Sequence, residues 1–210
     1  GNSGACSWSD YDNDGDMDLF VANFFTESNF LYENNGNGEF TKITTGEIVT
    51  DISASSSGSW GDYDNDNDID LFVTNNLGQN NFLYKNNGMS GFAKIASNPI
   101  VTDIGNSNGS AWGDYDNDGD LDMFVTNVFN GNNFLYENNG RGAFTKIISG
   151  EIVNDGGNSW GCSWGDYDND GDIDLFVATL GDNNFLYQNN NNGGHWINIL
   201  CLGSVSNRSA

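Results

Sequence analysis

Short apolar segments alternate with polar turns along this chain, and the same order of segments returns every 52 residues. One tryptophan marks the same point of each repeat, at Trp8, Trp60, Trp112 and Trp164. Behind each tryptophan stand an Asp-rich stretch, two apolar runs and an Asn-rich turn. A period of about 20–50 residues is typical of solenoids and propellers, in which each unit buries its apolar surface on its neighbours.

Four segments of strand length recur in each repeat. In the fourth copy the first three are residues 161–164, 175–177 and 185–187, and the fourth segment is clearest as residues 40–43 of the first copy. β-branched and aromatic residues dominate them, small residues fill the first one, and Asn-Gly turns separate the last two. No helical period of useful length is present. We therefore predict an all-β protein, a β-propeller of four-stranded antiparallel blades with four blades present.

The repeat boundaries divide the chain into blades 1–52, 53–104, 105–156 and 157–201, followed by a tail, 202–210. Both ends break off abruptly, so we expect a piece of a longer protein. This favours an open arc of a larger propeller. A closed four-bladed ring is the alternative, in which Cys6 and Cys162 would lie in neighbouring blades at equivalent positions.

Acidic residues outnumber basic residues by 30 to 6, which gives a formal net charge of -24. Such a charge disfavours contact with nucleic acid or with an anionic membrane surface. No apolar run is long enough for a membrane-spanning helix. We therefore expect neither nucleic-acid binding nor membrane insertion.

Twenty of the acidic residues lie in four copies of the loop DxDxDGDxD, which begins at Asp10 in the first copy. Five carboxylates within nine residues repel one another unless a cation neutralises them. Ligands that are all oxygen select a hard cation, and a flexible shell of six to eight oxygens suits Ca²⁺ better than Mg²⁺. Position 6 needs a positive φ, which Gly15 permits and which Asn67 of the second copy tolerates. An EF-hand is excluded because Val21 stands where that loop needs a glutamate.

These loops predict four Ca²⁺ sites, one per blade. We expect side-chain ligands from positions 1, 3 and 5, a backbone carbonyl from position 7, and a closing carboxylate from position 9. The candidate metal residues are Asp10, Asp12, Asp14, Asp16, Asp18, Asp62, Asp64, Asp66, Asp68, Asp70, Asp114, Asp116, Asp118, Asp120, Asp122, Asp166, Asp168, Asp170, Asp172 and Asp174.

Groups that could support catalysis are few. The chain has one histidine, His195, and two arginines, Arg141 and Arg208, and none of them repeats between the blades. A catalytic ion needs an acid, a base or an electrophile beside it. We therefore interpret the ions as structural and expect no enzymatic activity.

The pattern WGDYDNDGDxDLFV…NFLYxNNGxGxFTKI resembles the FG-GAP/VCBS repeat of integrin-α-type β-propellers, and the resemblance covers residues 1–201. It implies calcium in every loop, a secreted or cell-surface location, and a protein or glycan partner. The ending HWINILCLGSVSNRSA is similar to the opening of the ASPIC/UnbV domain, which suggests the start of a following domain in the tail.

The expected function is an extracellular, calcium-stabilised module for non-catalytic interaction or adhesion. The alternative is a glycan-binding lectin propeller, with 24–25, 75–76 and 129–130 as candidate sugar contacts. A calcium-dependent enzyme that acts on polysaccharides is a third reading, and it would need a base beside a cation such as Arg141.

Overall fold

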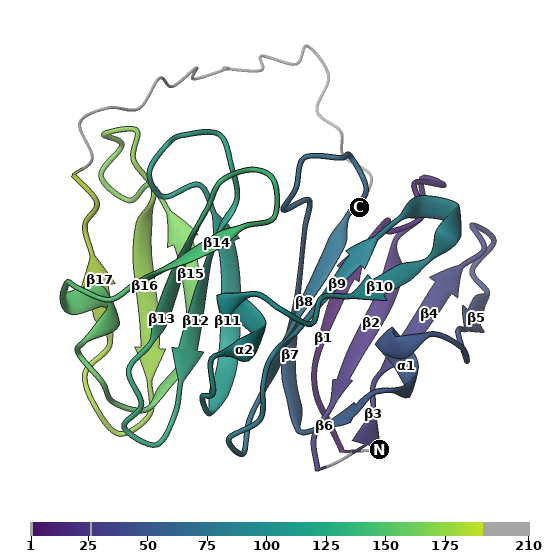
Figure 1. The fold of residues 1–210 in the computed structure, drawn as a ribbon, viewed down its shortest axis with the longest axis horizontal. Coiled ribbons are helices and arrows are strands. Elements are labelled where there is room, and N and C mark those ends of the chain that lie inside the picture. The colour runs from purple at the N-terminus through teal and green to yellow at the C-terminus, as the bar shows by residue number, and fades with distance from the viewer. Residues whose placement is uncertain (1, 26, 191–210) are drawn as a thin grey trace.

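Four small antiparallel sheets stand side by side in the computed structural model, which describes residues 2–25 and 27–190 (Figure 1). Each sheet takes its strands from one sequence repeat, so each repeat forms one blade. The all-β propeller architecture expected from the sequence is confirmed. The predicted blade boundaries stay a prediction, and the tail at 202–210 lies outside the described residues.

The strands follow one order in every blade. Blade 1 contains β1 (Ser3–Ser9), β2 (Asp18–Asn23), β4 (Phe30–Asn34) and β5 (Phe40–Lys42). Blade 2 contains β7 (Ser55–Gly61), β8 (Asp70–Asn75), β9 (Phe82–Asn86) and β10 (Phe92–Lys94). Blade 3 contains β11 (Ser107–Gly113), β12 (Asp122–Asn127), β13 (Phe134–Asn138) and β14 (Phe144–Ile147). Blade 4 contains β15 (Ser159–Gly165), β16 (Asp174–Thr179) and β17 (Phe185–Tyr187). Its predicted fourth strand, 196–199, lies outside the described residues.

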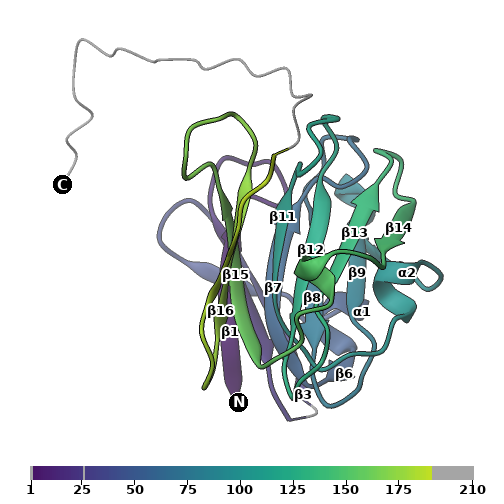
Figure 2. The same ribbon diagram turned by 90° about the vertical axis from the view of Figure 1, so that its left-hand side faces the viewer.

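Short elements join the blades. A two-stranded ribbon pairs β3 (Glu27–Ser28) with β6 (Ile52–Ser53). The one-turn helices α1 (Glu47–Thr50) and α2 (Pro99–Thr102) lie on the outer side of the arc (Figure 2). The 3-10 turns are η1 (Gly88–Ser90) and η2 (Glu151–Val153). One turn is too short for a helical period, so these helices leave no signal in the hydrophobic pattern.

Both faces of the central strands are buried, which explains their continuous apolar runs. In blade 2, Leu71 pairs with Trp60 and Tyr84, and this row packs towards blade 1. Phe72 pairs with Leu83, and this row packs towards blade 3. Successive residues of a strand point to opposite faces. The hydrophobic cores therefore lie between blades and not within them.

In blades 2, 3 and 4 a tryptophan of the first strand closes the junction with the preceding blade. Trp112 stacks on Tyr63 with ring centroids 6.3 Å apart and meets Phe72 edge-on at 6.2 Å. The same pair of contacts recurs in the other two junctions. Gly61 makes room for the ring, because a Cβ atom there would lie 2.8 Å from Trp112 Cδ1. The small residues of the first strand are thus required by the close approach of the next blade.

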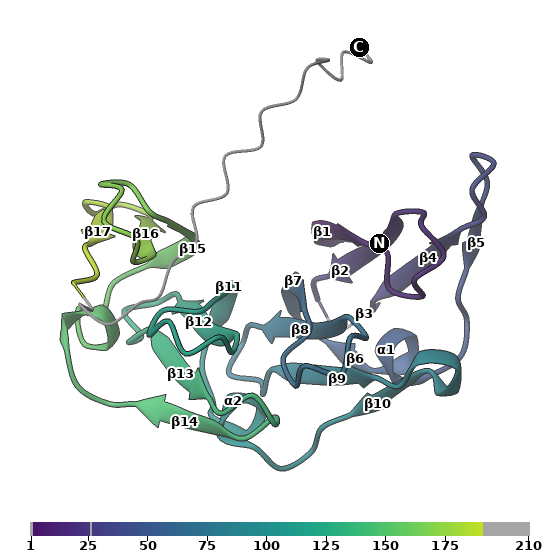
Figure 3. The same ribbon diagram turned by 90° about the horizontal axis from the view of Figure 1, so that it is seen from above.

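The two ends of the array remain open. Figure 3 shows the blades as an arc in which β1 and β15 lie apart, with β7 and β11 between them. Trp8 at one end is 51% exposed, and Phe176 at the other end is 43% exposed, although its equivalents Phe20 and Phe72 are fully buried. Of the two arrangements considered from the sequence, the structure therefore shows the open arc. The end surfaces are of the type that the inner blades bury against each other.

A ladder of buried amides and hydroxyls fastens the lower ends of the blades in Figure 1. Asn81 Nδ2 of blade 2 donates to Ser107 Oγ of blade 3 at 3.1 Å, and that hydroxyl donates to Asn127 Oδ1 at 3.1 Å. Blades 1 and 2 are joined by the same bonds. At the last junction Thr179 replaces the accepting asparagine, and Ser159 Oγ is left buried without a partner among the described residues.

We predict that Thr179→Asn stabilises the chain by about 0.5–1.5 kcal/mol, because it supplies the missing acceptor for Ser159. The reverse change in blade 3, Asn127→Thr, should destabilise it by about 1–3 kcal/mol, because Ser107 loses its acceptor. Urea unfolding of both variants checks the pair. Equal stability of Thr179→Asn and wild type would show that the ladder contributes nothing at this junction.

Candidate metal centre

The four Asp-rich loops connect the first and second strands of the blades. They form the turns of these hairpins, at the upper end in Figure 1. In blade 1, Ser9 at the end of β1 pairs with Asp18 at the start of β2, and this pair is the one next to the loop. Asp10 follows directly, so the pairing of the hairpin brings loop positions 1 and 9 together. We call residues 10–18, 62–70, 114–122 and 166–174 the metal loops.

Each metal loop curls around its first carboxylate. Asp10 Oδ1 accepts from the backbone N–H of Asp14, and Asp10 Oδ2 accepts from the N–H of Gly15, both at 3.0 Å. The turn needs left-handed backbone at two places, Asn13 with φ 61° and Gly15 with φ 95°. Asn67 replaces the glycine in blade 2 and adopts φ 71°, which confirms that asparagine is accepted at position 6.

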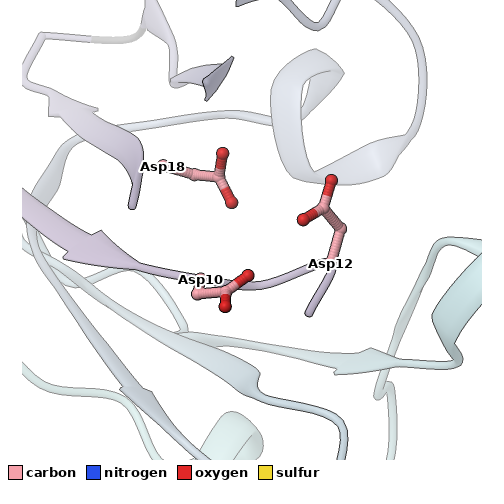
Figure 4. A group of neighbouring side chains, drawn as sticks. All are labelled: Asp10, Asp12 and Asp18. Carbon is pink, nitrogen blue, oxygen red and sulfur yellow. The ribbon is translucent and has the colours of Figure 1, made fainter. Parts of the chain in front are cut away.

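Three carboxylates converge in every loop. Figure 4 shows Asp10, Asp12 and Asp18 turned towards a common space. The converging groups are Asp10, Asp12 and Asp18; Asp62, Asp64 and Asp66; Asp114, Asp116 and Asp122; and Asp166, Asp168 and Asp174. Within each group the ligand oxygens lie within 4.8 Å of one another. One Ca²⁺ that binds each oxygen at about 2.3–2.6 Å could contact all three.

The position 9 carboxylates are the most deeply buried. Asp18, Asp70 and Asp122 are fully shielded from solvent. Asp70 accepts from the N–H groups of Tyr63 at 3.2 Å and Asn86 at 2.8 Å. Burial nevertheless raises the pKa of Asp18 to about 6 and the pKa values of Asp70 and Asp122 to about 7. A buried carboxylate is costly unless a cation compensates it, and the purely oxygen donor set fits Ca²⁺.

The remaining candidates lie outside these groups. The position 5 carboxylates of blades 1, 3 and 4 do not join them, and neither do the four position 7 carboxylates or Asp70, the position 9 residue of blade 2. Their assignment as ligands stays a prediction. Asp66 of blade 2 is the exception, because it takes the place that the position 9 residue has elsewhere.

Position 7 links one metal loop to the next. In blades 2 and 3 the left-handed asparagine at position 4 of the metal loop reaches the following blade: Asn65 Nδ2 donates to Asp120 Oδ1 at 2.8 Å, and Asn117 Nδ2 donates to Asp172 Oδ1 at 2.7 Å. A second bond runs the other way, from Asn138 Nδ2 to the carbonyl of Tyr63 at 2.6 Å. The position 4 asparagines were not among the residues predicted from the sequence, although their recurrence at one loop position was a signal.

A second class of residue was also missed. In each blade, the residue after the tyrosine of the third strand faces the metal loop. It is glutamate in blades 1 and 3, lysine in blade 2 and glutamine in blade 4: Glu33, Lys85, Glu137 and Gln188. Lys85 forms ion pairs with Asp64 and Asp66. Gln188 Nε2 donates to Asp168 Oδ2 at 2.5 Å.

A cavity of about 680 Å³ lies on the concave side of the arc, which we call the inner cavity. It is lined by the inner strands and by the loops that follow the second strands, so it lies towards the lower end in Figure 1, away from the metal loops. Of the candidate sugar contacts, Phe24, Asn76 and Phe129 line it. Asn75 does not, because it is fully buried in the amide ladder.

Known proteins were compared with the chain as a whole. The model of the FG-GAP-like repeat matches three times, over residues 10–73, 62–125 and 114–177. The chain belongs to the FG-GAP-like repeat family. Each match begins at position 1 of one metal loop and runs through the next loop into the second strand of the following blade. The repeat that the family model recognises therefore contains the junction between two blades.

No curated protein matches this FG-GAP-like chain. Among solved structures, one that describes the recognition of non-reducing terminal N-acetylglucosamine by an Agrocybe aegerita lectin superposes with a TM-score of 0.53 and 18% sequence identity. The match covers 88% of this chain and 51% of the lectin chain. The likeness supports the fold, and the chain spans about half the length of the lectin.

We predict that Asn117→Ala destabilises the chain by about 1.5 kcal/mol or more beyond Asn169→Ala. Both changes put alanine at a left-handed position, but only Asn117 bonds a carboxylate of a following blade, the nearly buried Asp172. Urea unfolding at one fixed calcium concentration measures the difference. Equal destabilisation by the two substitutions would show that the bond between the loops carries no stability.

Proposed function

We propose that this chain is an extracellular, calcium-stabilised propeller module that binds a partner and performs no catalysis. The separation of the metal loops from the inner cavity carries the proposal. Residues of the four metal loops do not line that cavity. Ions bound in the loops would therefore fasten hairpins at one end of the blades and leave the concave surface at the other end free for a ligand.

The lining of the inner cavity supports binding without catalysis. It consists of serine, asparagine, glycine and apolar residues, and among the described residues that line it only Cys162 is ionisable. Burial raises the pKa of Cys162 to about 12, so at neutral pH it is a thiol and not the nucleophilic thiolate. General acid–base catalysis needs positioned titratable groups, which this surface does not supply.

Exposed apolar residues on the rim of the inner cavity support contact with a partner. Leu77, Phe129 and Leu180 lie on the loops after the second strands and are 53%, 68% and 59% exposed. Leu77 and Phe129 also adopt left-handed backbone with φ 58°. Conformations that are costly for such side chains gather at sites of function. Large apolar groups held out at the edge of a cavity are typical of interaction surfaces.

The metal loops support an extracellular location, because weak oxygen-ligand calcium sites fill only where calcium is abundant. No helix within the described residues is both long enough and apolar enough to cross a membrane. On the chemistry of the metal loops alone, we place the chain outside the cytoplasm, as a secreted or surface-displayed module.

A glycan is the second candidate for the ligand. The inner cavity is lined by Trp160, which is 51% exposed, and by the partly exposed Asn108 and Asn158. Aromatic faces and amide groups together suit a neutral sugar, which has both apolar C–H faces and hydroxyl groups. The likeness to the Agrocybe aegerita lectin makes non-reducing terminal N-acetylglucosamine the first ligand to test.

Calcium should raise the melting temperature of the chain strongly, and excess EDTA should reverse the effect. At a calcium concentration of 100 times Kd, each filled site stabilises the folded state by about 2.7 kcal/mol. Magnesium should not substitute for calcium, because it needs near-ideal octahedral geometry. Differential scanning calorimetry checks this. A melting temperature that changes neither with calcium nor with EDTA would contradict the structural role of the ions.

Trp160→Ala should abolish binding to terminal N-acetylglucosamine on a glycan array if the inner cavity holds a sugar. Trp8→Ala is the matched control, because Trp8 is equally exposed at 51% but lies at the end of the arc, outside the cavity lining. A wild-type chain that binds no glycan on the array would leave a protein ligand as the proposal and reject the lectin.

A further inference from the structure

The metal loop of blade 2 has a lysine ammonium beside it. Lys85 Nζ of β9 forms an ion pair with Asp64 Oδ2 and lies 3.0 Å from Asp66 Oδ2. Both carboxylates belong to the converging group of the second loop. The lysine side chain is 29% exposed, and those of Asp64 and Asp66 are 11% and 35% exposed, so the pair is partly shielded from solvent.

The other blades have no ammonium at this place. In blades 1 and 3 the equivalent residues are Glu33 and Glu137, which add a sixth carboxylate beside the five of the loop. In blade 4 the neutral Gln188 donates one hydrogen bond to Asp168. The charge next to the metal loop therefore changes from negative through neutral to positive among repeats that are otherwise nearly identical.

The arrangement of the carboxylates changes with that charge. In blades 1, 3 and 4 the converging group comprises positions 1, 3 and 9. In blade 2 it comprises positions 1, 3 and 5, because Asp66 turns to Lys85. Asp70, the position 9 residue of blade 2, stays buried on its two backbone N–H donors and outside the group.

We propose that Lys85 is the built-in counter-ion of the second loop, so that at calcium concentrations which fill the loops of blades 1, 3 and 4 the chain binds three Ca²⁺ ions and not four. The proposal rests on the calcium sites proposed above and assigns them unequal strength. A divalent ion entering the second loop has to displace the ammonium or stand beside it. Two cations about 4 Å apart near a protein surface repel each other enough to weaken binding by at least about a hundredfold.

Counting bound calcium tests this directly. The 210-residue wild-type chain and its variants are dialysed at a free calcium concentration that just saturates the tightest class of site. Bound calcium is then counted by atomic absorption, and titration calorimetry gives the affinities of the sites. We expect three ions in wild type and four in Lys85→Gln, which installs the residue of blade 4. Lys94→Gln is the control, because Lys94 pairs with Asp51 and stacks on Phe82 away from the metal loops. It should bind three.

A second variant with the opposite expected effect keeps the test valid if Lys85→Gln fails to fold. Glu137→Lys places an ammonium beside the third loop and should reduce the count from three to two. Lys85→Gln should also make the melting temperature fall further in EDTA than that of wild type, because the second loop then has no counter-ion without calcium. Four ions of similar affinity in wild type, or three in Lys85→Gln, would overturn the role of Lys85. Absence of bound calcium in every variant would overturn the calcium proposal itself.

Discussion

Within the part of the chain that the structure describes, no blade has a hydrophobic core of its own, and the rest of the structure depends on the packing between blades. Each of the three core clusters takes buried residues from two neighbouring blades. The stacked pair of Trp112 on Tyr63 stands at such a junction and has an equivalent at each of the other two. Because both faces of an inner blade are covered, its stability is a property of the junctions rather than of the single repeat.

Polar contacts fasten the two ends of these apolar junctions. At the lower end in Figure 1, the Asn–Ser ladder runs from blade to blade through buried hydrogen bonds. At the upper end, an asparagine of one metal loop reaches a carboxylate of the next. An ion bound in one of the first three metal loops would therefore also help to position a hydrogen-bond donor for the following blade. These bonds join the metal loops to the same junctions that the aromatic stacks close, at the end of the blades that is away from the inner cavity.

The differences between repeats are as informative as their identity. Lys85 faces a metal loop where two other blades have glutamate, and Thr179 interrupts the amide ladder where three other blades have asparagine. Neither change disturbs the pairing of the strands. Both act on a polar site at the end of a blade, where a single side chain alters charge or hydrogen bonding without changing the apolar core. The blades share one pattern of strand pairing and differ in the charge and hydrogen bonding at their ends.

The sequence alone determined the repeat, the four-stranded blades and the place of the acidic loops, because strand alternation and loop chemistry are local and recur every 52 residues. It also indicated the left-handed turn at Gly15 and Asn67. The tertiary structure alone decided that the arc is open, which carboxylates converge, that Asn75 is buried, and that Lys85 lies among the carboxylates of its loop. Those features depend on how strands pair and blades pack, which brings together the two ends of each metal loop, residues of different strands and residues of different blades. A repeating pattern does not specify such contacts, because it describes one blade at a time while the packing and the charges act between blades and between strands.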